Sequence, residues 1–159
     1  MKRKRIIAVI GDSRCAKPAL ELAEEVGRLV AEKGAYLICG GYGGVMEAAA
    51  RGAKKAGGQT IGILSGKDSS DMNAYIDIPI VTGMRDARNI IIARTADGVL
   101  AVGGGFGTLS EIAFSLMLDK KIVGIASWRL AHSDKSRRAD FPLFSTPQKA
   151  VQKLFHLIS

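Results

Sequence analysis

Two glycine-rich turns contain the residues best suited to chemistry. They span residues 40–44 (GGYGG) and 103–108 (GGGFGT), and each follows a short apolar run and precedes a helical pattern. Glycines let the backbone adopt positive φ angles and let a ligand approach without a Cβ clash. The free N–H groups and the dipole at the start of each helix favour an anion, most often phosphate. The predicted phosphate or ligand contacts are Gly40, Gly41, Gly43, Gly44, Gly104, Gly105, Phe106, Gly107 and Thr108.

Two charged side chains, Arg88 and Glu111, are the candidate catalytic residues. Breaking an N-glycosidic bond builds positive charge on the ribose, and a carboxylate such as Glu111 can stabilise that charge or activate water. Arg88 can hold a phosphate bidentately or balance the charge of the leaving base. The residues expected to surround and orient these groups, without being the main ligand contacts, are Asp12, Ser13, Glu47 and Asn89.

Structural roles compete with each of these assignments. Thr108-Leu-Ser-Glu111 has the T-x-x-E pattern of a capping box, in which the glutamate reaches back to the start of its helix. Arg88, with Asp86 nearby, also fits an ordinary surface arginine. Glu47 lies in the first turn of its predicted helix and also fits a partner of the helix dipole. The residues alone leave both interpretations open.

Several common catalytic and metal-binding signatures are missing. Gly11-Asp12-Ser13 departs from the dinucleotide G-x-G-x-x-G fingerprint, and neither turn is followed by the Gly-Lys-Ser/Thr of a Walker A motif. These departures disfavour nicotinamide chemistry and ATP hydrolysis. Cys15 and Cys39 lack a C-x-x-C spacing and are expected to be buried thiols. His132 and His156 lie far from any acidic cluster, so no metal site is predicted.

Alternating strands and helices must position the candidate residues. Apolar runs predict strands over residues 6–10, 36–39, 60–64, 98–102 and 122–126. Helical patterns begin near residues 18, 45, 84, 108 and 147. Pro79 demotes residues 76–81 to an irregular or edge strand, and residues 128–144 are predicted to form an exposed loop that folds back at its apolar end.

This order predicts a single α/β domain over residues 1–159. The fold class is a doubly wound, Rossmann-like domain, with a parallel sheet and helices on both of its faces. Ligands in such sheets bind at the carboxyl ends of the strands, near the point where the strand order reverses. Both glycine-rich turns follow carboxyl ends of predicted strands, so we expect the site there.

The composition favours an anionic partner. The chain has 159 residues, a formal net charge of +8 and 6% aromatic residues. The positive charge suits phosphates, nucleotides or nucleic acid, whereas the small aromatic share argues against a base-stacking platform for single strands. The apolar runs are too short to span a bilayer, and the basic start leads into a strand instead of a signal peptide. We expect a cytoplasmic protein that does not bind a membrane.

The motifs and their order resemble those of the superfamily once labelled lysine decarboxylase-like. The similarity covers roughly residues 6–127 and rests on the two glycine-rich turns, the pairs Gly57-Gly58 and Ile61-Gly62, and the segment 84–88. This superfamily includes the Lonely Guy (LOG) cytokinin-activating phosphoribohydrolases and the molybdenum-cofactor carrier proteins. No pyridoxal-phosphate signature is visible, so lysine decarboxylation is not expected. The resemblance implies a homo-oligomer, either a dimer or a tetramer.

Two positions bring the chain closer to the carrier branch. The phosphoribohydrolases carry the motifs M-x-x-R-K and P-G-G-x-G-T-x-x-E, and Arg88 and Glu111 match their arginine and glutamate. Asn89 stands where that branch has lysine, and Gly103 stands where it has proline. Both forms look more like the molybdenum-cofactor carriers. The resemblance therefore implies a molybdopterin-type cofactor or a nucleoside monophosphate as ligand, and no cofactor is required.

Three functions follow as competing hypotheses. The first is a carrier-type protein that binds a nucleotide or another phosphorylated small molecule at the glycine-rich turns. The second is a nucleoside 5′-monophosphate phosphoribohydrolase that uses Arg88 and Glu111. The third is single-stranded nucleic-acid binding, which the dispersed positive charge and the few aromatic residues make the least favoured.

Overall fold

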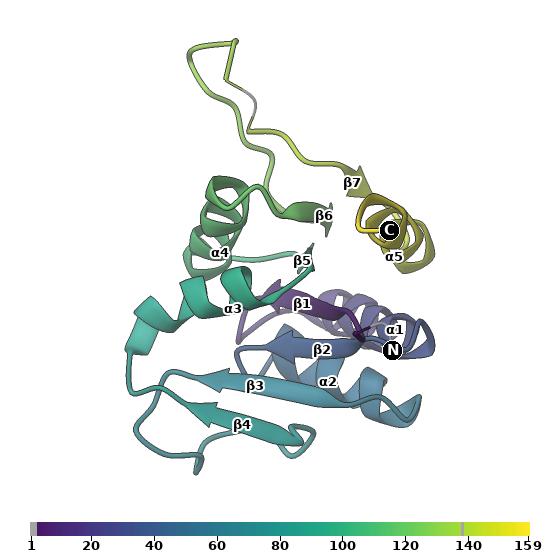
Figure 1. The fold of residues 1–159 in the computed structure, drawn as a ribbon, viewed down its shortest axis with the longest axis vertical. Helices are drawn as coiled ribbons and strands as arrows, with labels where there is room; N and C mark the ends of the chain where they lie inside the picture. Colours follow the sequence, from purple (N-terminus) through teal and green to yellow (C-terminus); the bar gives the residue numbers. More distant parts are fainter. Residues whose placement is uncertain (1–2, 138) are drawn as a thin grey trace.

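The strands of the computed structural model form one parallel sheet. Among residues 3–137 and 139–159, which the structure describes, seven strands lie in the order β4-β3-β2-β1-β5-β6-β7, and every neighbouring pair is parallel. The predicted Rossmann-like fold is therefore confirmed (Figure 1). The strands are β1 (Ile6–Gly11), β2 (Tyr36–Cys39), β3 (Thr60–Leu64), β4 (Ile78–Val81), β5 (Gly98–Val102), β6 (Lys121–Ile125) and β7 (Leu143–Phe144).

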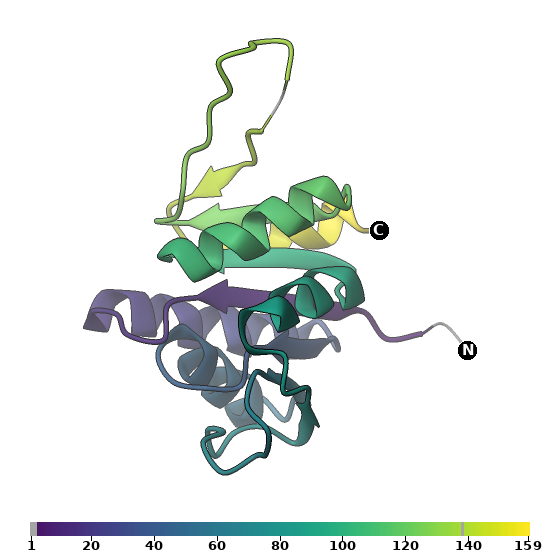
Figure 2. The same ribbon diagram turned by 90° about the vertical axis from the view of Figure 1, so that its left-hand side faces the viewer.

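Helices cover both faces of the sheet, as predicted. The first face carries three α-helices, and the opposite face carries two that lie side by side (Figure 2). A short 3₁₀ helix, η1 (Arg85–Arg88), leads into the second pair. The first set is α1 (Lys17–Glu32), α2 (Val45–Lys55) and α5 (Pro147–Leu157), and the second is α3 (Asn89–Thr95) and α4 (Phe106–Met117).

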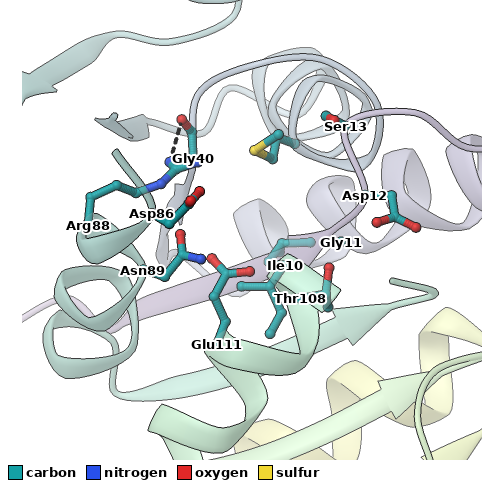
Figure 3. Close-up of a pocket in the computed structure, with 13 residues that line it drawn as sticks. Ile10, Gly11, Asp12, Ser13, Gly40, Asp86, Arg88, Asn89, Thr108 and Glu111 are labelled. Atoms are coloured by element: carbon teal, nitrogen blue, oxygen red, sulfur yellow. Dashed lines mark hydrogen bonds between the residues drawn. The ribbon is translucent and has the colours of Figure 1, made fainter. Parts of the chain in front are cut away.

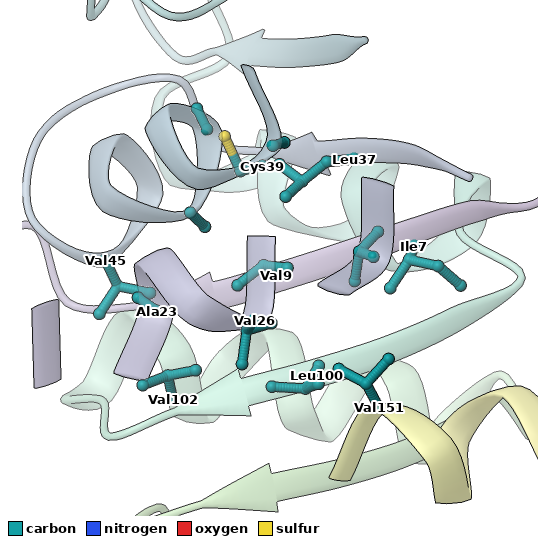
Figure 4. Close-up of a cluster of buried hydrophobic side chains, with 14 of the residues drawn as sticks. Ile7, Val9, Ala23, Val26, Leu37, Cys39, Val45, Leu100, Val102 and Val151 are labelled. Carbon is teal, nitrogen blue, oxygen red and sulfur yellow. The ribbon is translucent and has the colours of Figure 1, made fainter. Parts of the chain in front are cut away.

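The core consists of one apolar layer on each side of the sheet. Val9, Leu37 and Leu100 are fully buried between the sheet and the first set of helices (Figure 4). Ile92 and Ile112 fill the other layer from α3 and α4. Strands that are buried on both faces are expected to be apolar at every position. This explains why these strands appear in the sequence as short apolar runs.

Small residues let α1 and α2 approach each other closely. A Cβ at Gly27 would lie 1.9 Å from the main-chain oxygen of Ala49, so a larger residue would force the helices apart. The first predicted buried thiol, Cys39, is fully buried and burial raises its pKa to about 12, whereas Cys15 is only partly buried. The expectation for Cys15 is therefore corrected, because it lies in the turn before α1 instead of inside the layer.

The predictions for three less regular segments have different outcomes, and only the one for the helix from residue 84 is wrong. β4 is an edge strand, as Pro79 indicated, and its side chains are exposed. The single helix predicted from residue 84 is instead η1 followed by α3, and Arg85 begins it with a φ of 50°, which a regular helix does not allow. The excursion after β6 projects from the body (Figure 1), and its apolar end forms β7 at the far edge of the sheet.

The strand order reverses between β1 and β5. From β1 the chain builds outward through β2, β3 and β4, and from β5 it builds the other way through β6 and β7. The carboxyl ends of β1 and β5 are therefore adjacent, and the loops that follow them diverge. Such a crevice is the usual ligand site of an open α/β sheet. Within the described residues, no helix is both long and apolar enough to cross a membrane.

We expect the α3–α4 face to associate with a second copy of the chain. Met117 is 62% exposed on α4, and Ile90 and Ile91 are only partly buried on α3. Burying such a surface between two copies would remove apolar area from water. Light scattering at micromolar concentration should give at least a dimer, and Met117→Lys should lower the mass. Gln152→Lys, on the exposed side of α5, should not; a protomer mass for the wild type would refute this expectation.

Candidate functional site

A pocket of about 240 Å³ lies in the crevice where the strand order reverses (Figure 3). Its walls come from the ends of β1 and β2, from η1 and the start of α3, and from the first two turns of α4. It therefore lies where the fold predicts a ligand site. The lining residues are Val9, Ile10, Gly11, Asp12, Ser13, Gly40, Met46, Asp86, Arg88, Asn89, Gly107, Thr108 and Glu111.

Asp12 fixes the geometry of the crevice. Its carboxylate Oδ1 accepts a hydrogen bond from the N–H of Gly105 at 2.7 Å, just before α4. Its main-chain oxygen accepts one from the N–H of Val45 at 2.9 Å, at the first residue of α2. One residue after β1 thus connects the starts of both helices that follow glycine-rich turns.

The first glycine-rich turn packs tightly against this connection. A Cβ at Gly44, where φ is +64°, would lie 2.2 Å from the main-chain oxygen of Asp12. A Cβ at Gly11 would lie 2.6 Å from the oxygen of Val102, at the end of β5. Glycine is needed at both positions because backbone segments meet there. In this turn the glycines bring loops together more than they open space for a ligand.

The second turn leaves three N–H groups free at the start of α4. Gly105 is the N-cap residue, and no side chain caps the helix. Among the described residues, the N–H groups of Phe106, Gly107 and Thr108 have no acceptor, while Leu109 donates to the oxygen of Gly105. Free N–H groups at the positive end of a helix dipole attract an anion. Gly107 and Thr108 both line the pocket.

The capping-box interpretation of Thr108 and Glu111 is wrong. α4 begins at Phe106, two residues earlier than the sequence pattern predicted, so both residues lie inside the helix. A capping box requires its threonine at the N-cap, where the structure has Gly105. Glu111 is therefore not held at the helix start and is available to the pocket.

Glu111 is a mostly buried residue of the pocket wall, and its carboxyl group makes no hydrogen bond to the described residues. Its side chain points into the pocket (Figure 3), and the residue is 8% exposed. Burial raises its pKa to about 8, although the positive charge of Arg88 acts in the opposite direction. At neutral pH most molecules therefore carry this side chain as the neutral acid.

Arg88 is not an ordinary surface arginine. Its Nη1 donates to the main-chain oxygens of Gly40, at 2.8 Å, and Ile63, so the guanidinium connects the ends of β2 and β3. The guanidinium also lies over the ring of Tyr42, 5.6 Å from its centroid. Its Nε is buried and has no partner in the described part of the chain. Arg88 lines the pocket, but its Nη1 is already hydrogen-bonded to the ends of two strands.

The remaining polar residues of the pocket differ in exposure. Asn89 is 7% exposed and its Nδ2 donates to Ser110 Oγ at 3.0 Å. Thr108 is 2% exposed, whereas Ser13 lies exposed at the rim. Asp86 is also exposed, and sequence reasoning missed it as a pocket residue. Its position two residues before Arg88 was the available signal.

Some predicted site residues lie outside the pocket lining. Gly104, with a φ of +115°, packs against the side chain of Thr108. Phe106 is 82% exposed and pairs with Trp128, with ring centroids 6.0 Å apart. Conversely, no pattern in the sequence indicated that Val9, Ile10 and Met46 form an apolar part of the lining. The other predicted residues that do not line the pocket are Gly41, Gly43, Gly44, Gly105 and Glu47.

The pocket places donors and a carboxyl group along one helix. The free N–H groups lie in the first turn of α4, and Glu111 follows about one turn further along the same helix, beside the amide of Asn89 (Figure 3). Asp12 and Asp86 add negative charge, so the positive charge of the whole chain is not concentrated in this pocket. In the described part of the chain, no three His, Cys, Asp or Glu side chains gather as metal ligands would.

A family profile matches nearly the whole chain. The SLOG cluster4 profile covers residues 4–151. The chain belongs to the SLOG cluster4 family. A curated but uncharacterised protein of Archaeoglobus fulgidus is 42% identical over 145 residues, which is 91% of each chain. A cytokinin riboside 5′-monophosphate phosphoribohydrolase of Mycobacterium tuberculosis is 33% identical over 120 residues, which is 69% of this chain and 63% of the relative.

Solved structures of molybdenum-cofactor proteins are similar to this SLOG cluster4 member. The molybdenum cofactor binding protein of Rippkaea orientalis superposes with a TM-score of 0.91 at 36% identity over 100% of both chains. The molybdenum cofactor carrier protein of Chlamydomonas reinhardtii gives 0.86 at 35% identity over 98% of both chains. DNA processing protein A of Streptococcus pneumoniae gives 0.72 at 18% identity, which shows a shared fold only. The predicted superfamily and the closeness to the carrier branch are confirmed.

Glu111→Gln should change how stability depends on pH. The pKa of Glu111 is about 8 in the fold against an ordinary 4.5. Between those values the unfolded chain has lost the proton that the folded chain retains. The free energy of unfolding of the wild type should therefore fall, relative to the variant, by about 1.4 kcal/mol per pH unit between about pH 5 and pH 8, then level off. Urea unfolding at several pH values measures this; a pH-independent difference would mean that Glu111 is charged in the fold.

Proposed function

We propose that this SLOG cluster4 protein binds a phosphorylated heterocycle in the pocket between β1 and β5. A pterin phosphate of the molybdenum-cofactor type is the first candidate, and a purine nucleoside monophosphate is the second. In either case the phosphate accepts hydrogen bonds from the free N–H groups at the start of α4, beside Gly107 and Thr108. The protein then acts as a carrier that holds its ligand without reacting with it.

One observation supports this proposal above the others. The pocket is lined by Gly107 and Thr108, whose first-turn N–H groups are unpaired, and by the unpartnered Glu111 about one turn further along the same helix. A native protein leaves such groups unpaired in few places, and ligand sites are among them. The size is suitable, because a cavity of about 150 Å³ holds one benzene ring and this one is about 240 Å³. A bicyclic ring fits that volume, with the phosphate at the first turn of α4.

The phosphoribohydrolase function is the second candidate, because Arg88 and Glu111 both line the pocket. Two features favour the carrier. Arg88 donates to two main-chain oxygens, and the raised pKa of Glu111 keeps that group mostly neutral at pH 7. In the free protein this group is therefore not a preformed negative charge that would stabilise a positive ribose. Its remaining catalytic role would be that of a general acid.

Gly107→Val should abolish ligand binding while leaving the fold intact. A Cβ at Gly107 meets no atom within 4 Å, so the fold has room for the larger side chain, yet the residue lines the pocket. The branched side chain would occupy the position of the ligand phosphate. Thermal shift with GMP and with a pterin phosphate should show stabilisation of the wild type and none of the variant. Ala16→Val, at the exposed N-cap of α1, is the control.

Two outcomes would contradict the proposal. Equal stabilisation of wild type and Gly107→Val would place the ligand elsewhere. Release of free base from a purine monophosphate at about one per second or faster, an ordinary enzymatic rate, would replace the carrier by the hydrolase.

A further inference from the structure

The carboxyl group of Glu111 needs a partner that the described chain does not provide. Burying a polar group without a hydrogen bond is costly, and the cost is larger for a charge. The other carboxyl groups of the pocket do not have this problem. Asp12 accepts the N–H of Gly105, and Asp86 lies exposed to water. Glu111 alone among these three is buried, unpartnered and directed into the cavity (Figure 3).

We propose that Glu111 recognises the ring of the ligand by accepting two parallel N–H groups from a 2-amino-4-oxopyrimidine edge. This edge, with a ring N–H beside an exocyclic amino group, is common to pterins and guanine. This inference rests on the proposed function, because it assumes that a phosphorylated ring binds in the pocket and adds how the ring is oriented there. The phosphate lies at the start of α4, and the amino edge lies at Glu111, one to two turns further along the same helix.

The chemistry of the wall selects this edge. A carboxylate has two oxygens in one plane and can accept two adjacent N–H donors at once. Asn89 lies beside it: one N–H of its amide bonds Ser110 Oγ, and the second is available for the ring carbonyl next to the N–H pair. Val9, Ile10 and Met46 supply apolar contacts for the faces of a flat ring. An adenine ring does not offer the N–H pair.

Binding of this edge should release a proton. The charged or titratable groups that surround Glu111 are Arg88 and Asp86 from η1, Asp12 after β1 and Cys39 of β2. With the pKa of Glu111 at about 8, most free protein molecules carry the proton at pH 7. The N–H pair requires the carboxylate form. Calorimetry in two buffers of different ionisation heat should therefore find more protons released per GMP at pH 7 for the wild type than for Glu111→Gln, by up to about one proton, because in the variant only the phosphate still titrates.

The decisive experiment compares ligands with and without the exocyclic amino group, which is replaced by hydrogen in IMP and by a carbonyl in lumazine. GMP and IMP form one pair, and pterin and lumazine form a second pair that lacks phosphate. Wild type should bind GMP at least about tenfold more tightly than IMP, because IMP leaves part of the buried carboxylate unpaired. Glu111→Gln should reduce this ratio to near one. Asp86→Asn exchanges a second carboxyl group of the pocket for an amide; it can change the affinity for both ligands but should retain the ratio.

The outcomes separate this inference from the proposed function. If GMP and IMP bind wild type equally and Glu111→Gln changes neither, the site binds nucleotides but Glu111 does not read the ring, and the inference is overturned. If Asp86→Asn loses the ratio and Glu111→Gln keeps it, Asp86 is the acceptor and the inference is again overturned. If no ligand of either pair binds, the proposed function itself fails. A preference for pterin over lumazine together with GMP over IMP supports the shared edge, and the tighter-binding ligand of GMP and a pterin phosphate identifies the source of the ligand.

Discussion

The structure of the site depends on the two hydrogen bonds of Asp12. Through its carboxylate it holds the residue before α4, and through its main-chain oxygen it holds the first residue of α2. These bonds join the ends of β1, β2 and β5 at the point where the strand order reverses. They also explain the glycines at positions 11 and 44, where larger residues would collide with this connection. Without it, the first turn of α4 would not be held beside the pocket.

The arrangement separates two tasks that a phosphorylated ring presents to a protein. The anion requires donors, and a helix start provides them without any positively charged side chain. The ring requires shape and acceptors, and the buried wall around Glu111 provides them. Arg88 has a structural and an electrostatic role. Its guanidinium stabilises the ends of β2 and β3. Its positive charge lowers the pKa of Glu111 and so reduces the cost of burying that group as a carboxylate. An unpaired buried carboxyl group raises the free energy of the free protein. A ligand that completes its hydrogen bonds removes this cost, so the site binds that ligand more tightly than one without the matching N–H groups.

Local sequence pattern was sufficient for the architecture but not for the contacts. Apolar strands such as Gly98–Val102, alternating with helical patterns, determine a parallel sheet, and Pro79 marks an edge. The start of α4 was misplaced because Phe106 and Gly107 are poor helix formers. Their helical conformation follows from distant contacts: Gly105 donates to Asp12, 93 residues away, and accepts from the indole of Trp128. The same limitation applies to Arg88, whose partners are carbonyl groups on two other strands. Such contacts between distant parts of the chain cannot be predicted from the spacing of residues in the sequence.

The central claim is that the first N–H groups of α4 bind the phosphate of a heterocyclic ligand. An amide-detected NMR titration of the ¹⁵N-labelled protein with GMP tests it most directly. The account predicts that the amide resonances of Phe106, Gly107 and Thr108 show the largest shifts, that these shifts saturate together, and that they persist at physiological salt. Shifts dispersed over the surface lysines and arginines, with these three resonances unmoved, would contradict it.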